Sequence, residues 1–205
     1  MAKGNEGVSR LVRAVEGGKE FREWRAGNKA AYLSSVFIMA GNAAQLKGSD
    51  SGSGGPGNEW LVSYYDEADD TFTTFSTSGS QRAAKEQAFK KGKSLPRLDA
   101  ETVQVGILKC VELAEAVRTT SYKGEETSRI IIILQPLARS EILAGNEVSD
   151  GSSARALPKG SIRPVWNITY ITASFNVINV KIDAESGKVL SHHLSGVMDF
   201  MQKDK

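Results

Sequence analysis

The residues with the clearest chemical potential form a carboxylate cluster within the stretch EWLVSYYDEADDTFTTFSTSG, namely Asp66, Glu67, Asp69 and Asp70. Close carboxylates can bind a hard cation such as calcium, but the ligand spacing and the glycine of an EF-hand loop are absent. Aspartate is also common in turns, because its side chain accepts backbone N–H groups. We therefore interpret the cluster as the solvated turn of a β-hairpin and expect no metal there.

The two histidines and the single cysteine are the next candidates for chemistry. His192 and His193 are adjacent, and neighbouring side chains on a strand point to opposite faces, so the pair is poorly placed to chelate one metal. No G-x-S-x-G nucleophile elbow accompanies them. Cys110 falls on the apolar stripe of a predicted helix, which favours a small core residue over a reactive thiol. We expect no cofactor and no metal, and an enzyme is the less favoured interpretation.

Two further stretches could contact phosphate. The loop Gly48 to Asn58, GSDSGSGGPGN, lacks the Lys and Ser/Thr of a P-loop and precedes no predicted helix, so we interpret it as a flexible loop. A basic run follows later, with Phe89 as its one aromatic residue. It comprises Arg82, Lys85, Lys90, Lys91, Lys93 and Arg97. Few aromatic residues are present for base stacking, so a solvated helix is favoured over a nucleic-acid site.

Four aromatic residues recur at matching positions and are the candidate ligand-binding set: Trp60, Tyr64, Trp166 and Tyr170. Aromatic side chains commonly fill the space between a helix and a curved sheet. If they faced outward instead, they would line a surface suited to a peptide or small ligand. The alternation along residues 166–171 favours the core.

Composition excludes several classes. The chain has 205 residues, 40% hydrophobic and 24% charged, which is ordinary globular usage. Its 26 Lys and Arg nearly balance 24 Asp and Glu, so no strong field for nucleic acid is present. No apolar segment is long enough for a signal peptide or membrane span. We expect a cytoplasmic chain, unless an export leader has been removed from its start.

The pattern of apolar residues predicts the elements that must position these groups. A short helix is expected over 8–15, ended by Gly17 and Gly18, then a second over 19–25 and a strand over 31–40. A hairpin covers 59–79, and a polar helix covers 81–91. The clearest helix is expected over 99–119, capped by Asp99. RIIIILQ at 129–135 has no alternation, which suits a strand buried on both faces, and a second hairpin closes the chain from 163 to 193.

The two halves of the chain offer these elements in the same order. Trp60 to Tyr64 and Trp166 to Tyr170 share the pattern W-x-(V/I)-(S/T)-Y, and a long polar loop interrupts each half at the same point. We predict a tandem repeat of one α+β unit, with a first unit at 1–79, a basic helical linker at 80–97 and a second unit at 98–205.

The segment VKIDAESGKVLS, residues 180–191, predicts a strand, a tight turn and a returning strand. Asp183 can accept backbone N–H groups two or three residues on, and Gly187 tolerates the left-handed conformation that closes such a turn. This signature resembles the end of PepSY domains, small cystatin-like modules with a helix against a curved antiparallel sheet. The resemblance covers Trp166 to Ser191 and implies a fold of two cystatin-like or PepSY-like units, each a helix packed on an antiparallel sheet.

PepSY modules are associated with peptidase propeptides and cell-envelope proteins and are thought to bind or inhibit peptidases. Together with the missing catalytic constellation, the resemblance implies a non-catalytic binding module that holds a protein or peptide through its sheet or loops. The alternative is a small-molecule-binding or enzymatic protein with a pocket between helix and sheet. A homodimer through unpaired sheet edges is compatible with either.

Overall fold

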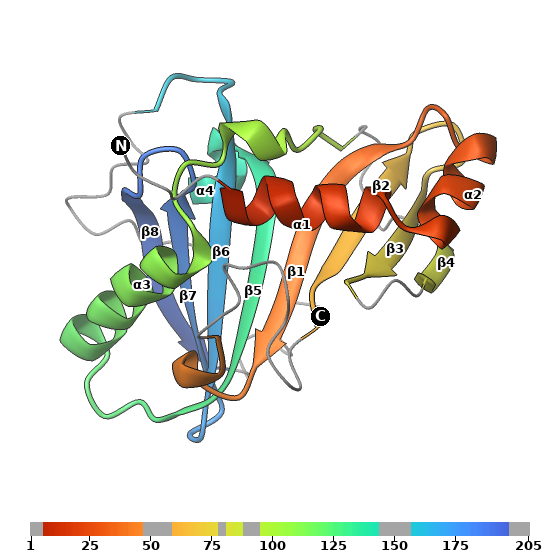
Figure 1. Ribbon diagram of the computed structural model, residues 1–205. Coiled ribbons are helices and arrows are strands. Elements are labelled where there is room, and N and C mark those ends of the chain that lie inside the picture. Colours follow the sequence, from red (N-terminus) through yellow and green to blue (C-terminus); the bar gives the residue numbers. More distant parts are fainter. Residues whose placement is uncertain (1–5, 47–58, 78–80, 88–94, 144–156, 197–205) are drawn as a thin grey trace, which may run out of the picture.

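The fold of the chain is seen in a computed structural model, which describes residues 6–46, 59–77, 81–87, 95–143 and 157–196 (Figure 1). Its helices are α1 (Glu6–Glu16), α2 (Lys19–Gly27), α3 (Ile107–Ser121) and α4 (Arg139–Leu143), with 3-10 turns η1 (Ala43–Leu46) and η3 (Ala100–Thr102). Its strands are β1 (Tyr32–Ala40), β2 (Leu61–Asp66), β3 (Thr71–Ser76), β4 (Gln81–Gln87), β5 (Thr127–Ala138), β6 (Ile162–Thr172), β7 (Asn176–Asp183) and β8 (Val189–Gly196). The predicted glycine loop and most of the second polar loop lie outside the described residues.

All eight strands belong to one antiparallel sheet in the order β4-β3-β2-β1-β5-β6-β7-β8. The two halves of the chain meet where β1 pairs with β5, from Val36 opposite Leu134 to Ala40 opposite Ile130. The prediction of two units, each a helix packed on its own sheet, is therefore wrong. The reason is that β1 and β5 would both be sheet edges in separate units, and each satisfies its backbone groups by pairing with the other.

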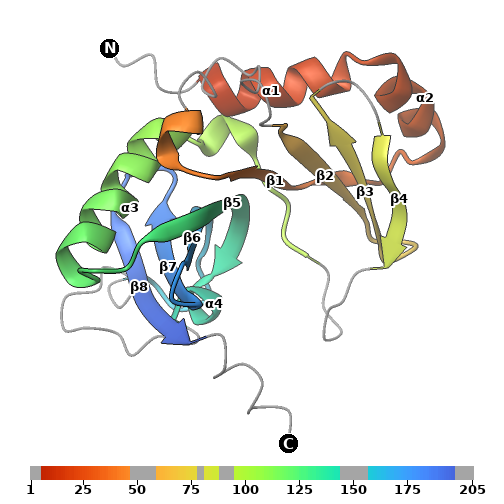
Figure 2. The same cartoon turned by 90° about the horizontal axis from the view of Figure 1, so that it is seen from below.

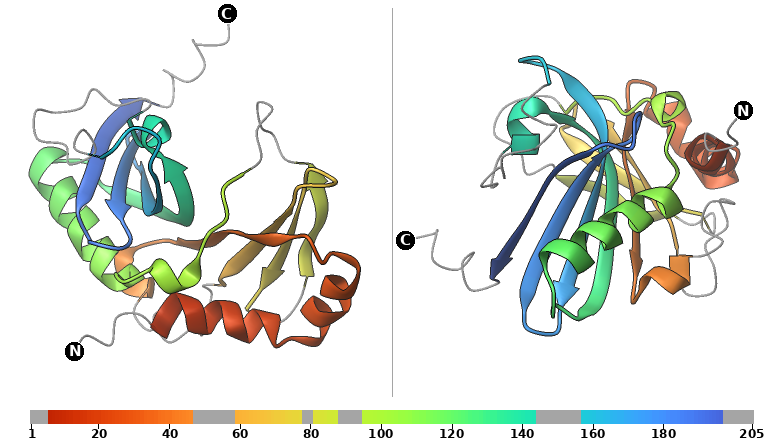
Figure 3. Two further views of the ribbon diagram at one scale, coloured as in Figure 1. Left: turned by 90° about the horizontal axis from the view of Figure 1, so that it is seen from above. Right: turned by 90° about the vertical axis from the view of Figure 1, so that its left-hand side faces the viewer.

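Helices α1, α2 and α3 lie on one side of this sheet, and α4 lies on the other (Figure 2). Helix α3 runs obliquely over β6, β7 and β8 (Figure 3). One buried core spans both halves beneath these helices and includes Leu11 of α1, Val36 of β1, Ile107 of α3 and Ile168 of β6. No described helix has the length and apolar character needed to cross a membrane.

The N-terminal helices follow the predicted periodicity. Val8, Leu11, Val12 and Val15 are all buried, and α1 ends where Gly17 and Gly18 follow it. The second half departs from prediction at its helix: Asp99 caps η3 by accepting the Glu101 N–H at 3.0 Å, and α3 begins only at Ile107. The residues between them are held outside a helix, because the N–H groups of Gln104 and Val105 both donate to the carbonyl of Ala184.

Residues 81–87 form strand β4, so the helix predicted over 81–91 is wrong there. Pairing with β3, including Thr71 opposite Gln87 and Thr74 opposite Ala83, decides the conformation of this polar segment. Tertiary context of this kind commonly overrides intrinsic helix propensity. The remainder of the predicted helix and linker, 88–94, lies outside the described residues.

The β7–β8 hairpin forms as predicted, and so does its turn mechanism. Asp183 Oδ1 accepts the N–H groups of Glu185 at 2.9 Å and Ser186 at 2.8 Å. Gly187 has φ +74°, in the left-handed region that favours glycine. The first hairpin is also confirmed: β2 and β3 flank an acidic turn in which Asp66 accepts the Ala68 N–H at 3.0 Å. Both acidic-turn motifs are therefore corners of the sheet.

Strand β5 is fully buried on one face only. Ile130, Ile132 and Leu134 are in the core beneath the helices, whereas Ile131 and Ile133 are half-buried on the opposite face. The expectation that this run is buried on both faces is wrong, because α4 covers that opposite face only near Leu137, Val165 and Leu190. We call the part of this face that no described helix covers the helix-free face, defined by Phe37, Met39, Leu61, Ile131, Ile133, Asn167, Thr169 and Asn179.

Candidate functional site

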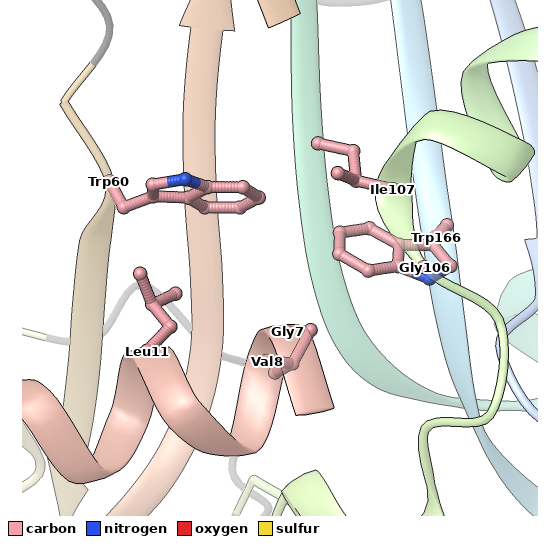
Figure 4. A pocket seen from close by; sticks show the side chains of 7 residues that line it. All are labelled: Gly7, Val8, Leu11, Trp60, Gly106, Ile107 and Trp166. Atoms are coloured by element: carbon pink, nitrogen blue, oxygen red, sulfur yellow. The ribbon is translucent and has the colours of Figure 1, made fainter. Parts of the chain in front are cut away.

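The two repeated tryptophans point toward one another across the middle of the sheet (Figure 4). Trp60 precedes β2 and is 2% exposed, and Trp166 lies on β6 and is 0% exposed. With Val8 and Leu11 of α1 and Ile107 of α3 they enclose a cavity of about 10 Å³. That volume accommodates one water molecule at most. The tryptophans are therefore part of the core, and a larger ligand has no room between them.

The two indoles differ in their hydrogen bonding. Trp166 Nε1 donates to the carbonyl of Val105 at 2.8 Å, and this ties β6 to the start of α3. Trp60 Nε1 is buried without an acceptor in the part of the chain that the structure describes. The matching sequence motif therefore does not produce matching environments.

Tyr64 lies in an aromatic cluster with Phe21, Trp24 and Phe75, with ring centroids 4.8 to 6.1 Å from its own. Its hydroxyl donates to Glu16 Oε1 at 3.1 Å. Burial, followed by the nearby Glu16 carboxylate, raises the pKa of Tyr64 above its ordinary value, so this phenol stays protonated through the physiological range. A neutral, buried phenol serves here as a hydrogen-bond donor to the end of α1.

Tyr170 of the second half is also buried beside a glutamate, but among the described residues its hydroxyl has no hydrogen-bond partner. Burial and then the Glu115 carboxylate raise its pKa, while the positive charge of Arg118 opposes the shift. The Arg118 guanidinium lies 6.0 Å from the centre of the Tyr170 ring and donates from Nη2 to Glu115 Oε2 at 2.9 Å. Each half thus places a buried tyrosine near a glutamate and an arginine that come from its helices.

The arginines of both sets hold the chain that follows each helix. Arg25 Nη1 donates to the carbonyls of Asn28 and Ala31 after α2. Arg118 Nη1 donates to the carbonyl of Glu125 after α3 at 2.7 Å. Carbonyls near a helix C-terminus lack intrahelical partners, so a cationic side chain there stabilises the turn back to the strand.

A surface hollow opens beside each of these sets. The first, of about 440 Å³, is lined by residues that include Glu16, Arg25, Tyr64 and Arg97, and we call it the Arg97 hollow. The second, of about 690 Å³, is lined by residues that include Glu115, Arg118, Glu125 and Glu126, and we call it the Glu125 hollow. Both volumes fall in the range of small-molecule sites.

Charge is distributed differently in the two hollows. In the Glu125 hollow, Arg118 is paired with Glu115. Hydrogen bonds from Ser174, and then from Thr172 and Asn176, lower the pKa of Glu125. In the Arg97 hollow, the Arg97 guanidinium lies 5.3 Å from the centre of the Tyr32 ring, and no described carboxylate forms an ion pair with it. The Arg97 hollow therefore has a cation available to a ligand, and the Glu125 hollow has anions.

The remaining candidates occupy the positions that sequence reasoning assigned. His192 and His193 point to opposite faces: His192 Nδ1 lies 2.7 Å from the Tyr122 hydroxyl beside α3, and His193 lies near Lys181. Cys110 is fully buried on α3. Among the described residues, no group of three or more His, Cys, Asp or Glu is arranged to hold a metal ion.

Sequence reasoning missed both hollows and the helix-free face. Glu16, Arg25, Arg97, Glu115 and Arg118 carry no motif, and long-range contacts bring them together. A signal did exist for the helix-free face, since the unbroken apolar run at 130–134 has more β-branched residues than a one-sided strand requires. The basic-run residues Arg82 and Lys85 lie on β4, and Arg97 of the same run lines a hollow.

Comparison with known proteins adds little. No protein-family model matches the chain, and a search of curated proteins gives no significant match. Among solved structures, the crystal structure of a candidate lipoprotein from Clostridium difficile 630 is similar over 86% of this chain and 90% of that chain, at 11% identity and a TM-score of 0.43. Neither the fold nor the function of this chain follows from a likeness at that level.

Proposed function

We propose that this chain is a non-catalytic binding module that holds a protein or peptide partner on the helix-free face of its sheet. The observation that supports the proposal is the half-exposed apolar centre of that face. Phe37 lies opposite both Leu61 and Ile133 across the neighbouring strands, and Met39, which is 41% exposed, lies opposite Ile131. Contiguous apolar area of this kind on a folded domain commonly marks an interaction site.

Polar groups border the apolar centre on β6 and β7. Asn179 Nδ2 donates to Asn167 Oδ1 at 2.6 Å and to Thr169 Oγ1 at 2.9 Å, so these amides are held in defined positions. An apolar centre beside ordered polar groups is the usual arrangement in protein interfaces, where the polar groups determine orientation. PepSY domains, whose terminal hairpin the β7–β8 hairpin resembles, are thought to bind or inhibit peptidases, so peptidases are among the first partners to test.

Site-specific photo-cross-linking in the native host tests the proposal. A photoreactive residue replaces Met39, and in a matched control it replaces Phe175, a 76%-exposed residue in the β6–β7 turn. We expect a defined adduct with another polypeptide at position 39 and none at position 175. Met39→Glu should abolish capture of the same polypeptide while leaving the circular dichroism spectrum unchanged. Equal adducts at both positions would contradict the proposal, as would an adduct of twice the chain's own mass.

A further inference from the structure

The Arg97 hollow lies at the start of β1, and it shares no residue with the helix-free face. Its walls come from α1, α2, the start of β1 and the segment that leads into η3. Its apolar floor includes Val12, Leu33 and Leu98. The backbone of Leu98 is hydrogen-bonded to the sheet, because its N–H donates to the carbonyl of Leu33 at 2.9 Å. The hollow therefore has an apolar floor that is anchored to β1, with charged side chains around it.

Two guanidinium groups line this hollow, and both are held in place. Arg25 is fixed by the carbonyls of Asn28 and Ala31. Arg97 lies against the Tyr32 ring, whose hydroxyl donates to the carbonyl of Leu95 at 2.6 Å. Hydrogen bonds to neutral carbonyls and a contact with an aromatic face leave the positive charge of each guanidinium uncompensated. Preorganised arginines of this kind suit a carboxylate ligand.

Three carboxylates also line the hollow. Glu101 is neutralised at the rim by Arg13, at 3.2 Å. Among the described residues, Glu16 accepts the neutral Tyr64 hydroxyl and pairs with no cation, and Asp99 accepts the Glu101 N–H. A carboxylate can accept several hydrogen bonds, so Glu16 and Asp99 keep both acceptor capacity and charge. The uncompensated charges are thus two positive and two negative, around an apolar floor.

We propose that the Arg97 hollow binds a small zwitterion of the amino-acid class, with its carboxylate at Arg97 and Arg25, its ammonium at Glu16 and Asp99, and an apolar side chain on the Val12–Leu33–Leu98 floor. A simple anion would meet the two carboxylates, and a simple cation would meet the two arginines. Only a ligand carrying both charges is complementary to both pairs. This inference is independent of the partner proposed for the helix-free face, since the two sites share no residue.

The matched hollow in the second half supplies an internal comparison. There Glu115 already neutralises Arg118, and Glu125 and Glu126 add negative charge, so the same ligand lacks an available cation. We therefore expect the zwitterion to occupy the Arg97 hollow and not the Glu125 hollow.

Nuclear magnetic resonance titration of the full chain with L-leucine tests the proposal. We expect backbone shift changes at Leu33, Leu98 and Tyr64 and none at Gly124 or Thr127. N-acetyl-L-leucine and L-leucinamide, each with one charge removed, should bind about tenfold more weakly, as expected when one charged hydrogen bond is lost. No shift change up to saturating leucine would overturn the proposal, as would equal affinity for N-acetyl-L-leucine.

Variants identify the residues responsible. Arg97→Ala should weaken leucine binding by about tenfold without unfolding the chain, because the Arg97 side chain is exposed. Arg129→Ala removes an exposed arginine outside the hollow and should leave leucine affinity unchanged. An equal loss in both variants would mean that leucine responds to overall charge, which would overturn the assignment to this hollow.

Discussion

Phe37 of β1 lies directly opposite Ile133 of β5, within the antiparallel pairing that joins the two halves of the sheet. The pairs on either side of it are Val36 opposite Leu134 and Ile38 opposite Ile132. Side chains alternate between faces along each strand, so Phe37 and Ile133 face away from the helices while their neighbours face the core. The junction is therefore both the middle of the core and the middle of the proposed binding face.

An isoleucine-to-alanine substitution should lower the free energy of unfolding by different amounts on the two faces of the β1–β5 junction. Ile132→Ala creates a cavity in the core beneath the helices and should lower the free energy of unfolding by about 2–5 kcal/mol. Ile131→Ala, one residue away on the helix-free face, should cost about 1 kcal/mol or less, because its side chain is already partly hydrated. Urea denaturation followed by circular dichroism measures both. Equal losses would contradict the assignment of the faces.

Continuity of the sheet predicts that the two halves unfold together. If one half unfolded alone, the other half would be left with an unpaired strand edge and an exposed apolar surface, because the halves share the β1–β5 pairing and one core. Tryptophan fluorescence, which reports on Trp24 and Trp60 in the first half and on Trp166 in the second, and far-ultraviolet circular dichroism should give one coincident urea transition. Two separated transitions would show that the halves are independent folding units.

Substitutions in the turn between β7 and β8 should lower the free energy of unfolding by amounts that depend on the residue replaced and on its replacement. Gly187→Ala forces a side chain into a backbone with φ +74° and should cost about 1 kcal/mol. Gly187→Asn should cost less, because asparagine tolerates this region better. Asp183→Ala should cost about 1–3 kcal/mol, since two backbone N–H groups lose their acceptor. Gly27→Ala, where an added methyl meets no atom within 4 Å, is the control and should be neutral or slightly stabilising.

The lowered pKa values of the two histidines predict that the free energy of unfolding decreases as the pH falls. Burial lowers the pKa of His192, and burial followed by the charges of Lys181 and His192 lowers the pKa of His193. Between the lowered folded-state pKa and the ordinary value of about 6.5, the unfolded chain binds more protons than the folded chain. The free energy of unfolding should therefore be constant near pH 7.5 and fall as the pH drops below about 6.5.

Replacing His193 tests whether the histidines cause the loss of stability at low pH. His193→Asn cannot titrate, so its free energy of unfolding should fall less steeply between pH 7 and pH 5 than that of the parent chain. Urea denaturation at several pH values gives both slopes. An unchanged slope would assign the acid sensitivity to other groups, such as the carboxylates.

Local sequence chemistry determined much of this protein. The apolar period of α1, the β1 strand between Ala31 and Gly41, both hairpins and the Asp183–Gly187 turn follow from neighbouring residues alone, because caps, turns and side-chain alternation act over a few positions. The burial of Trp166 and Tyr170 also follows from alternation along their strand.

Only the tertiary structure decided the rest. Ladder pairing with β3 makes residues 81–87 a strand, and pairing of β1 with β5 joins the halves into one sheet. The partial exposure of Ile131 and Ile133 depends on where α4 packs, and the Arg97 hollow depends on residues as far apart as Glu16 and Asp99 meeting in space. Such contacts leave no local period in the sequence, because hydrogen bonds and burial between distant segments are satisfied only once the whole sheet has formed.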